Sequence, residues 1–176
     1  MGRKRLIVID MQNDFCKPEG VLYNPEAEAI IPNIQARMKN YKKEEIFFTM
    51  DTHNIRKYDL TIEGRNLPIH CVFGTNGHAI VNEFTKNVLD GHTITKNSFM
   101  TEYWDILNRE DDELITSIEL CGTCTDICVL SNALALRSLY PYTKIIVHAD
   151  CCAGTSKAAH EAALKVMKSC MIEVIE

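Results

Sequence analysis

Short apolar runs alternate along this chain with longer segments of helical periodicity. The runs contain many β-branched residues and are bounded by polar residues, a pattern typical of buried strands. They predict strands at residues 6–9, 46–49, 93–95, 114–120, 145–148 and 171–175. Helices are predicted between them, at residues 27–41, 127–140 and 156–169.

This alternation predicts the fold class. In the first predicted helix, apolar residues recur at spacings of three and four, so that one stripe faces a core. Strands that alternate with helices imply a mostly parallel sheet with helices on both faces. The sequence contains no internal repeat or linker, so we predict a single α/β domain over residues 1–176. Only residues 50–79 lack clear periodicity, and so long a loop in a compact domain is usually functional.

Composition narrows the class of protein. The formal net charge of −5 argues against non-specific binding to nucleic acid. The basic residues 2–5 precede an apolar run too short for a signal peptide, and no later segment is long and apolar enough to span a membrane. We therefore expect a cytoplasmic protein whose eight cysteines are reduced.

Residues able to do chemistry follow the ends of several predicted strands. Ligands of open parallel sheets bind outside the carboxyl ends of the strands. The residues at those ends are Asp10, Asp51, His53, Lys96, the segment 121–128, His148 and Asp150. Solvent exposure explains polar residues there, but it does not require an acid, a lysine and a cysteine at one edge. His148 and Asp150 are expected to be structural.

The segment after the fourth predicted strand suits a reactive thiol. A turn at Gly122 precedes Thr125 and Asp126, either of which is a predicted N-cap for the next helix. If Thr125 is the cap, Cys128 takes the third helical position. The helix N-terminus stabilises an anion there, so we expect a depressed pKa for the thiol. The exposed amides of the turn could receive an oxyanion.

Three other interpretations of this segment stay open on position alone. Cys128 could be a buried core cysteine without chemistry. Cys121 and Cys124 have the Cys-x-x-Cys spacing of thiol redox motifs. Cys121, Cys124 and Cys128 would also offer three thiolates to zinc, although no second Cys or His pair stands nearby at zinc-finger spacing.

Asp51, His53 and His70 form a second candidate site. Residues 51 and 53 point the same way in an extended segment, and His70 lies further along the irregular stretch. Glu63, between them, is a further candidate ligand. Two imidazoles and a carboxylate suit zinc, iron or manganese and leave coordination open for water or substrate. Histidine and aspartate are also common in surface loops, so these residues alone leave the metal site open.

Four segments, taken in order, resemble the isochorismatase-like cysteine hydrolases, and within that family the nicotinamidases. They are residues 8–15 (VIDMQNDF), Asp51-Thr52-His53 with residues 68–75 (PIHCVFGT), Lys96 with Ser98 and Phe99, and residues 122–129 (GTCTDICV). The resemblance runs from residue 6 to about residue 155. The chain departs from the family pattern at Asn66-Leu67, near which relatives often carry a tryptophan, and at Cys124, where a small apolar residue is usual.

The resemblance implies a Rossmann-like three-layer sandwich with a mostly parallel six-stranded sheet. It also implies that Cys128 is the nucleophile, Asp10 the general base and acid, and Lys96 the cation beside both. The backbone amides of Cys124 and Cys128 would bind the oxyanion, helped by a cis peptide between Thr123 and Cys124.

The family further implies one divalent metal ion, zinc before iron or manganese. Its ligands would be Asp51, His53 and His70, to which the position of Glu63 between them adds a fourth candidate. The substrate pocket would be lined by Phe15, Leu67 and Phe99. The predicted activity is hydrolysis of a small carboxamide through a thioester, with nicotinamide giving nicotinate and ammonia. The alternatives are a metal-free family member acting on another small amide and the thiol redox or zinc module described above. Many relatives self-associate, so a homo-oligomer is compatible with the resemblance.

Overall fold

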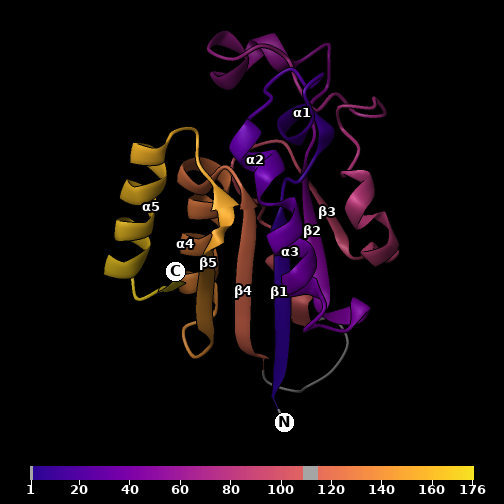
Figure 1. Cartoon of the computed structure of the whole chain (residues 1–176). Helices are drawn as coiled ribbons and strands as arrows, with labels where there is room; N and C mark the ends of the chain where they lie inside the picture. The colour runs from indigo at the N-terminus through magenta and orange to yellow at the C-terminus, as the bar shows by residue number, and fades with distance from the viewer. Residues whose placement is uncertain (1, 109–114) are drawn as a thin grey trace.

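The computed structural model describes residues 2–108 and 115–176, and its strands form one sheet in which all neighbouring strands are parallel (Figure 1). The strand order in this six-stranded sheet is β3-β2-β1-β4-β5-β6. The strands are β1 (Arg3–Ile9), β2 (Ile46–Asp51), β3 (Thr93–Lys96), β4 (Ile115–Thr123), β5 (Lys144–Ala153) and β6 (Glu173–Ile175). The predicted α/β fold is therefore confirmed, with a wholly parallel sheet. Position 114 of the fourth predicted strand lies outside the described residues.

Helices and short helical turns connect the strands. The α-helices are α1 (Asn13–Cys16), α2 (Pro25–Ala29), α3 (Ile31–Met38), α4 (Leu130–Leu139) and α5 (Lys157–Ser169). A π-helical turn, Thr125–Val129, leads directly into α4. Short 3-10 turns lie at Lys43–Glu45, Tyr58–Leu60, Glu63–Arg65, Asn82–Asn87 and Trp104–Asn108.

The single helix predicted at residues 27–41 is wrong, because α2 and α3 occupy that region as two helices. Pro32 is the second residue of α3. Proline has no N–H to donate to the carbonyl four residues earlier, and its ring crowds that carbonyl, so it interrupts a continuous helix. Proline is well suited to the first turn of a new helix, which is where it lies here.

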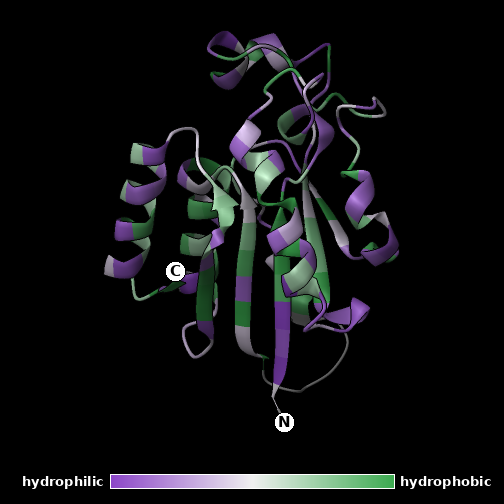
Figure 2. Ribbon diagram, viewed as in Figure 1, coloured by the Kyte–Doolittle hydropathy of each residue, from purple (hydrophilic) through white to green (hydrophobic). Residues whose placement is uncertain are grey.

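Helices cover both faces of the sheet, as predicted. Successive residues of a strand point to opposite faces. Ile7 and Ile9 of β1 accordingly contact a core shared with α4 and α5, while Leu6 and Val8 enter a second core shared with α3 (Figure 1). In Figure 2 the central strands are largely hydrophobic apart from the hydrophilic start of β1, and the helices around them have mixed hydropathy. Among the helices of residues 2–108 and 115–176, none has the length and apolar content needed to cross a membrane.

The strand order creates a crevice at the carboxyl edge of the sheet. β2 and β3 lie on one side of β1, whereas β4, β5 and β6 lie on the other, and ligands bind at such a change of direction. β1 and β4 approach closely at this edge. Gly122 has φ +121°, and a Cβ there would lie 2.1 Å from the carbonyl oxygen of Ile9, so only glycine fits.

A partly buried ion pair joins α3 to the sheet. Glu119 of β4 accepts a hydrogen bond from Arg37 Nε at 2.9 Å, and its Oε2 lies 2.7 Å from His148 Nε2. Burial raises the pKa of Glu119, but the contacts of its carboxylate with His148 and Arg37 outweigh burial and lower the pKa from 4.5 to about 2. His148 therefore has a structural partner, in line with the expectation for it.

We expect the Glu119→Gln variant to be less stable than the wild type near neutral pH, by about 1–3 kcal/mol. The carboxyl has a lower pKa in the folded chain than in the unfolded chain. Its stabilisation is therefore present above pH 4.5 and is lost as the pH falls towards about 2. Urea unfolding at about pH 7 and about pH 3.5 measures the difference, with Glu173→Gln on the exposed face of β6 as the control. If the difference in unfolding free energy between wild type and Glu119→Gln were the same at both pH values, the ionised carboxylate of Glu119 would not be the stabilising group.

Candidate active site

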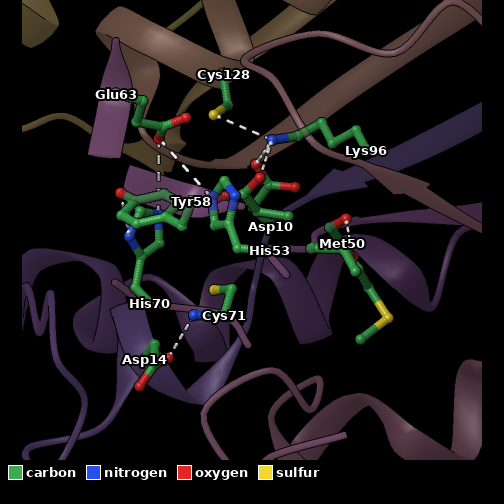
Figure 3. Close-up of polar contacts among 12 residues, drawn as sticks. Asp10, Asp14, Met50, His53, Tyr58, Glu63, His70, Cys71, Lys96 and Cys128 are labelled. Atoms are coloured by element: carbon green, nitrogen blue, oxygen red, sulfur yellow. Dashed lines mark hydrogen bonds and ion pairs between the residues drawn. The ribbon is translucent and has the colours of Figure 1, made fainter. Parts of the chain in front are cut away.

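Lys96 lies at the centre of a buried polar cluster at the carboxyl edge of the sheet (Figure 3). Its Nζ is 2.7 Å from Asp10 Oδ2, 3.4 Å from Cys128 Sγ and 3.5 Å from Asp51 Oδ1. The side chain of Lys96 is only 1% exposed. The structure thus brings together the three residues of the predicted triad, which end or follow three different strands. Their catalytic roles stay a prediction.

Asp10 is held in an uncommon backbone conformation. Its φ of +49° lies in the left-handed region, which non-glycine residues rarely adopt outside turns and functional sites. The backbone N–H of Asp10 donates to Thr49 Oγ1 at 3.1 Å, and the Thr49 hydroxyl donates to Asp10 Oδ1 at 2.7 Å. Sequence reasoning missed Thr49, because a threonine within a β-branched run looks like any other strand residue.

The charges of the triad follow from its burial. Burial raises the pKa of Asp10, and the neighbouring Lys96 opposes that rise only in part. Burial also raises the pKa of the Cys128 thiol, as does the carboxylate of Asp10, and Lys96 again opposes the rise. Burial lowers the pKa of Lys96, but the carboxylates of Asp10 and Asp51 outweigh burial and keep the ammonium charged.

The predicted depression of the Cys128 pKa is therefore wrong for the resting protein. Burial of the thiol disfavours the thiolate by more than the nearby cation and the helix N-terminus favour it. The thiol consequently needs a base to remove its proton. Asp10 suits that role, because its pKa is raised and it contacts Lys96, which also contacts Cys128.

The predicted helix cap is also wrong. Cys124 precedes the first turn and makes no capping bond with its side chain. Thr125 Oγ1 instead lies 2.8 Å from His160 Nδ1 of α5. Cys128 takes the fourth helical position rather than the third, within the π-helical turn. The peptide between Thr123 and Cys124 is cis, as the resemblance implied.

Asp126 forms a long-range contact in place of a cap. Its Oδ1 accepts a hydrogen bond from the backbone N–H of Thr155 at 2.8 Å, and its Oδ2 accepts one from the Thr155 hydroxyl at 2.5 Å. These contacts join segments 29 residues apart, so no local pattern could predict them. They fix the loop before α5 as one wall of the crevice.

The four candidate metal ligands Asp51, His53, Glu63 and His70 lie together, and Figure 3 shows the dashed contacts of Glu63 with the two histidines. Asp51 Oδ2 is 3.0 Å from His53 Nε2 and 3.1 Å from His70 Nε2. Glu63 Oε1 lies 3.9 Å and 3.8 Å from the same two nitrogens. One ligand atom from each residue lies within 4.8 Å of all the others. Three of the four residues are buried.

The surroundings of this cluster suit a cation. Asp51 and Glu63 place two carboxylates close together, and burial raises the pKa of Glu63, helped by the charge of Asp51. A cation among them would relieve this repulsion. His70 Nδ1 lies 3.0 Å from the carbonyl oxygen of Pro68 and 3.2 Å from Tyr58 Oη, so His70 Nε2 faces the cluster. Such outer contacts orient metal-binding histidines, and the nitrogen and oxygen donors suit zinc, iron or manganese.

A cavity of about 390 Å³ connects Cys128 with this donor cluster. The predicted pocket residues Phe15, Leu67 and Phe99 all line it, and their role in substrate binding stays a prediction. The cavity wall also includes residues without a sequence signal, among them Leu22, Tyr23, Asn24 and Thr155. Phe15 packs edge-on against His70, with ring centroids 5.5 Å apart. A small planar molecule in this cavity could reach the thiol and the donor cluster together.

The three cysteines of the rival thiol module do not gather at one point. Cys121 is fully buried in the core shared with α3, and its Sγ contacts the carbonyl oxygen of Ile7 at 3.7 Å. Cys124 and Cys128 instead line the cavity. Within residues 2–108 and 115–176, the one group of three or more clustered metal-binding side chains is the Asp51 cluster. The geometry therefore gives no support to a three-thiolate zinc site.

Comparison with known proteins reveals relatives over nearly the whole chain. A family model described as the isochorismatase domain matches residues 4–176. The nicotinamidase of Schizosaccharomyces pombe is 27% identical over 205 residues, which cover 97% of this chain and 91% of that protein. The nicotinamidase of Saccharomyces cerevisiae is 26% identical, with 82% of this chain and 86% of that protein covered.

Solved structures give the same answer. A nicotinamidase/pyrazinamidase from Bacillus subtilis is similar with a TM-score of 0.80 and 27% identity, covering 99% of this chain and 100% of that one. A pyrazinamidase from Pyrococcus horikoshii, solved in complex with zinc, has a TM-score of 0.81 and 27% identity over 99% of each chain. The family match over residues 4–176 and the shared fold lead to one conclusion: this chain belongs to the isochorismatase family.

Proposed function

We propose that this protein is a cysteine amidohydrolase that converts nicotinamide, or a similar small aromatic carboxamide, into the acid and ammonia. The observation that carries the proposal is the buried contact of Lys96 with both Asp10 and Cys128, beside a cavity that reaches a set of metal-binding side chains. The named relatives add support, since two of them are nicotinamidases.

The triad geometry suits nucleophilic catalysis by a thiol. Asp10 accepts the proton of Cys128, and Lys96 stabilises the thiolate. The thiolate attacks the amide carbon, and the backbone amides of Cys124 and Cys128 receive the oxyanion. Asp10 returns the proton to the leaving nitrogen, so that ammonia departs and a thioester remains. Water then attacks the thioester, with Asp10 as its base, and releases the acid and free Cys128.

Asp51, His53, His70 and Glu63 would hold the divalent ion. When bound, the ion supplies a Lewis-acid contact for a donor atom of the substrate, such as a ring nitrogen. Phe15 and Phe99 offer aromatic surface, and Leu67 offers aliphatic surface, to a flat ring in the cavity. These contacts favour a pyridine-type carboxamide over an aliphatic amide.

Ammonia release by the purified protein tests this function. We expect nicotinamide and pyrazinamide to be hydrolysed, chelation to reduce turnover by at least about tenfold, and added zinc, iron or manganese to restore it. Benzamide is the matched control, because it keeps the carboxamide and lacks the ring nitrogen, so it should be a poor substrate that responds little to chelation.

Other outcomes would point away from this assignment. Equal turnover of nicotinamide before and after complete metal removal would favour the metal-free alternative. No turnover of nicotinamide with any of the three metals would move the substrate to another small amide. Three thiols protected in the native protein and released by a chelator would favour the thiol module at Cys121, Cys124 and Cys128.

A further inference from the structure

Thr49 lies directly behind the carboxyl group of Asp10. It belongs to β2, is 1% exposed, and does not line the cavity that connects Cys128 with the metal-binding side chains. Two hydrogen bonds join the two residues: the backbone N–H of Asp10 donates to Thr49 Oγ1 at 3.1 Å, and the Thr49 hydroxyl lies 2.7 Å from Asp10 Oδ1. This pair of bonds also holds Asp10 at its positive φ.

The direction of these bonds follows from the chemistry of the groups. A backbone N–H can only donate, so Thr49 Oγ1 must accept from it. The hydroxyl has one proton of its own, and among the described residues Asp10 Oδ1 is the acceptor that it reaches. Oδ1 is therefore fixed as a hydrogen-bond acceptor. A proton placed on Oδ1 would weaken that buried bond, because the O–H oxygen of a carboxylic acid is a poorer acceptor than a carboxylate oxygen.

The other carboxylate oxygen faces the reacting groups. Asp10 Oδ2 lies 2.7 Å from Lys96 Nζ, and the same nitrogen lies 3.4 Å from Cys128 Sγ. We propose that Thr49 is a positioning residue that directs the proton of Cys128 onto Oδ2 of Asp10 and keeps it off Oδ1. This inference rests on the proposed function, since it names the oxygen atom of Asp10 that receives the proton removed from Cys128.

The proton balance is simple. The S–H bond of Cys128 breaks and an O–H bond forms at Asp10 Oδ2, which leaves a thiolate and a neutral carboxylic acid. Lys96 keeps its ammonium charge throughout and stabilises the thiolate. The O–H bond at Oδ2 later breaks as the proton passes to the departing nitrogen. Oδ2 is the oxygen that contacts Lys96, which also contacts the thiol, so the same atom serves as base and as acid.

Two substitutions of Thr49 separate this role from a structural one. Thr49→Val keeps the shape of the side chain and removes the hydroxyl, while Thr49→Ser keeps the hydroxyl. Thr143→Val is the matched control: Thr143 is also buried, and its hydroxyl donates to the carbonyl oxygen of Ile115 at 2.9 Å, outside the site. The readouts are the rate of alkylation of Cys128 by iodoacetamide, followed at that residue by mass spectrometry, and kcat and KM for nicotinamide.

We expect Thr49→Val to slow alkylation about tenfold and to lower kcat about 100-fold, with KM nearly unchanged. Thr49→Ser should restore both rates to within about threefold, and Thr143→Val should leave both near the wild-type values. Zinc content should be equal in all variants, which checks that Asp51 is undisturbed. If the valine variant fails to fold, Thr49→Ala removes the same hydroxyl and carries the same expectation.

Wild-type alkylation in a folded Thr49→Val or Thr49→Ala variant would overturn the inference, as would a serine variant that rescues neither rate. Alkylation requires no amide. A protein that never releases ammonia from nicotinamide would therefore contradict the proposed substrate, and the alkylation rates would still decide the role of Thr49.

Discussion

The Cys128→Ala variant is expected to lose ammonia release by at least about 10³-fold, because no other group described here can take the place of the attacking thiolate. The fold should survive. Cys128 is buried at the edge of the core shared with α4 and α5, and removal of one sulfur atom costs about 1–2 kcal/mol of stability. Ammonia assays and thermal unfolding of the same preparation measure the two effects.

Cys152→Ala is the matched control for this experiment. Cys152 belongs to the same core cluster and is 5% exposed, yet it does not line the cavity. Its replacement should cost a similar amount of stability and leave turnover intact. Substantial turnover by Cys128→Ala, or an equal loss in both variants, would show that Cys128 contributes through packing rather than through its thiol.

Replacement of Lys96 by methionine is expected to abolish activity and also to destabilise the metal-free protein by about 3–5 kcal/mol. The Lys96 ammonium contacts the carboxylates of Asp10 and Asp51, and its side chain is 1% exposed. Methionine fills a similar volume, so the loss arises mainly from two buried carboxylates that keep no cation. Chemical unfolding and ammonia release are the measurements.

A double variant and a control at a surface ion pair show whether Lys96→Met acts through the lost charge or through the changed side-chain shape. Asp10→Asn in the Lys96→Met background removes one of the uncompensated charges, so it should recover part of the stability and none of the activity. Lys17 forms an ion pair with Glu83 at 2.7 Å, with side chains 22% and 35% exposed. Lys17→Met should change stability by less than about 1 kcal/mol. If Lys96→Met were as stable as Lys17→Met, the Lys96 ammonium would not be stabilising the buried carboxylates of Asp10 and Asp51.

The sequence was sufficient to place the main residues of the site, because parallel strands bring their carboxyl ends to one edge. Asp10, Asp51 and Lys96 each follow or end a strand whose apolar run is plain in the sequence. Glu63 was a candidate only because it lies between His53 and His70 in the sequence, since its 3-10 turn has no periodicity that could place it in space. Pro32 is a local signal for the break between α2 and α3, but the apolar residues spaced by three and four on both sides of it suggested a single helix.

Contacts between distant segments could not be predicted in this way. Thr125 meets His160 across 35 positions of the chain, and this contact replaces the expected helix cap. Thr49 meets Asp10 across 39 positions, and nothing in either local pattern indicates that bond. The extent to which the Cys128 thiol is buried could not be predicted either. Periodicity indicates which face of a helix is buried, but the pKa of a thiol depends on how completely it is enclosed.

The irregular stretch after β2 has a consequence for how this fold can diversify. The proposed catalytic groups Asp10, Lys96 and Cys128 end or follow strands of the sheet. Three of the four candidate metal ligands come instead from residues 53–70, a stretch without a strand. The groups proposed for bond cleavage and those proposed for substrate choice thus come from separate segments of the chain, so one set can change in evolution while the other is kept. Asp51 limits that freedom, because one of its oxygens faces Lys96 and the other faces the two histidines.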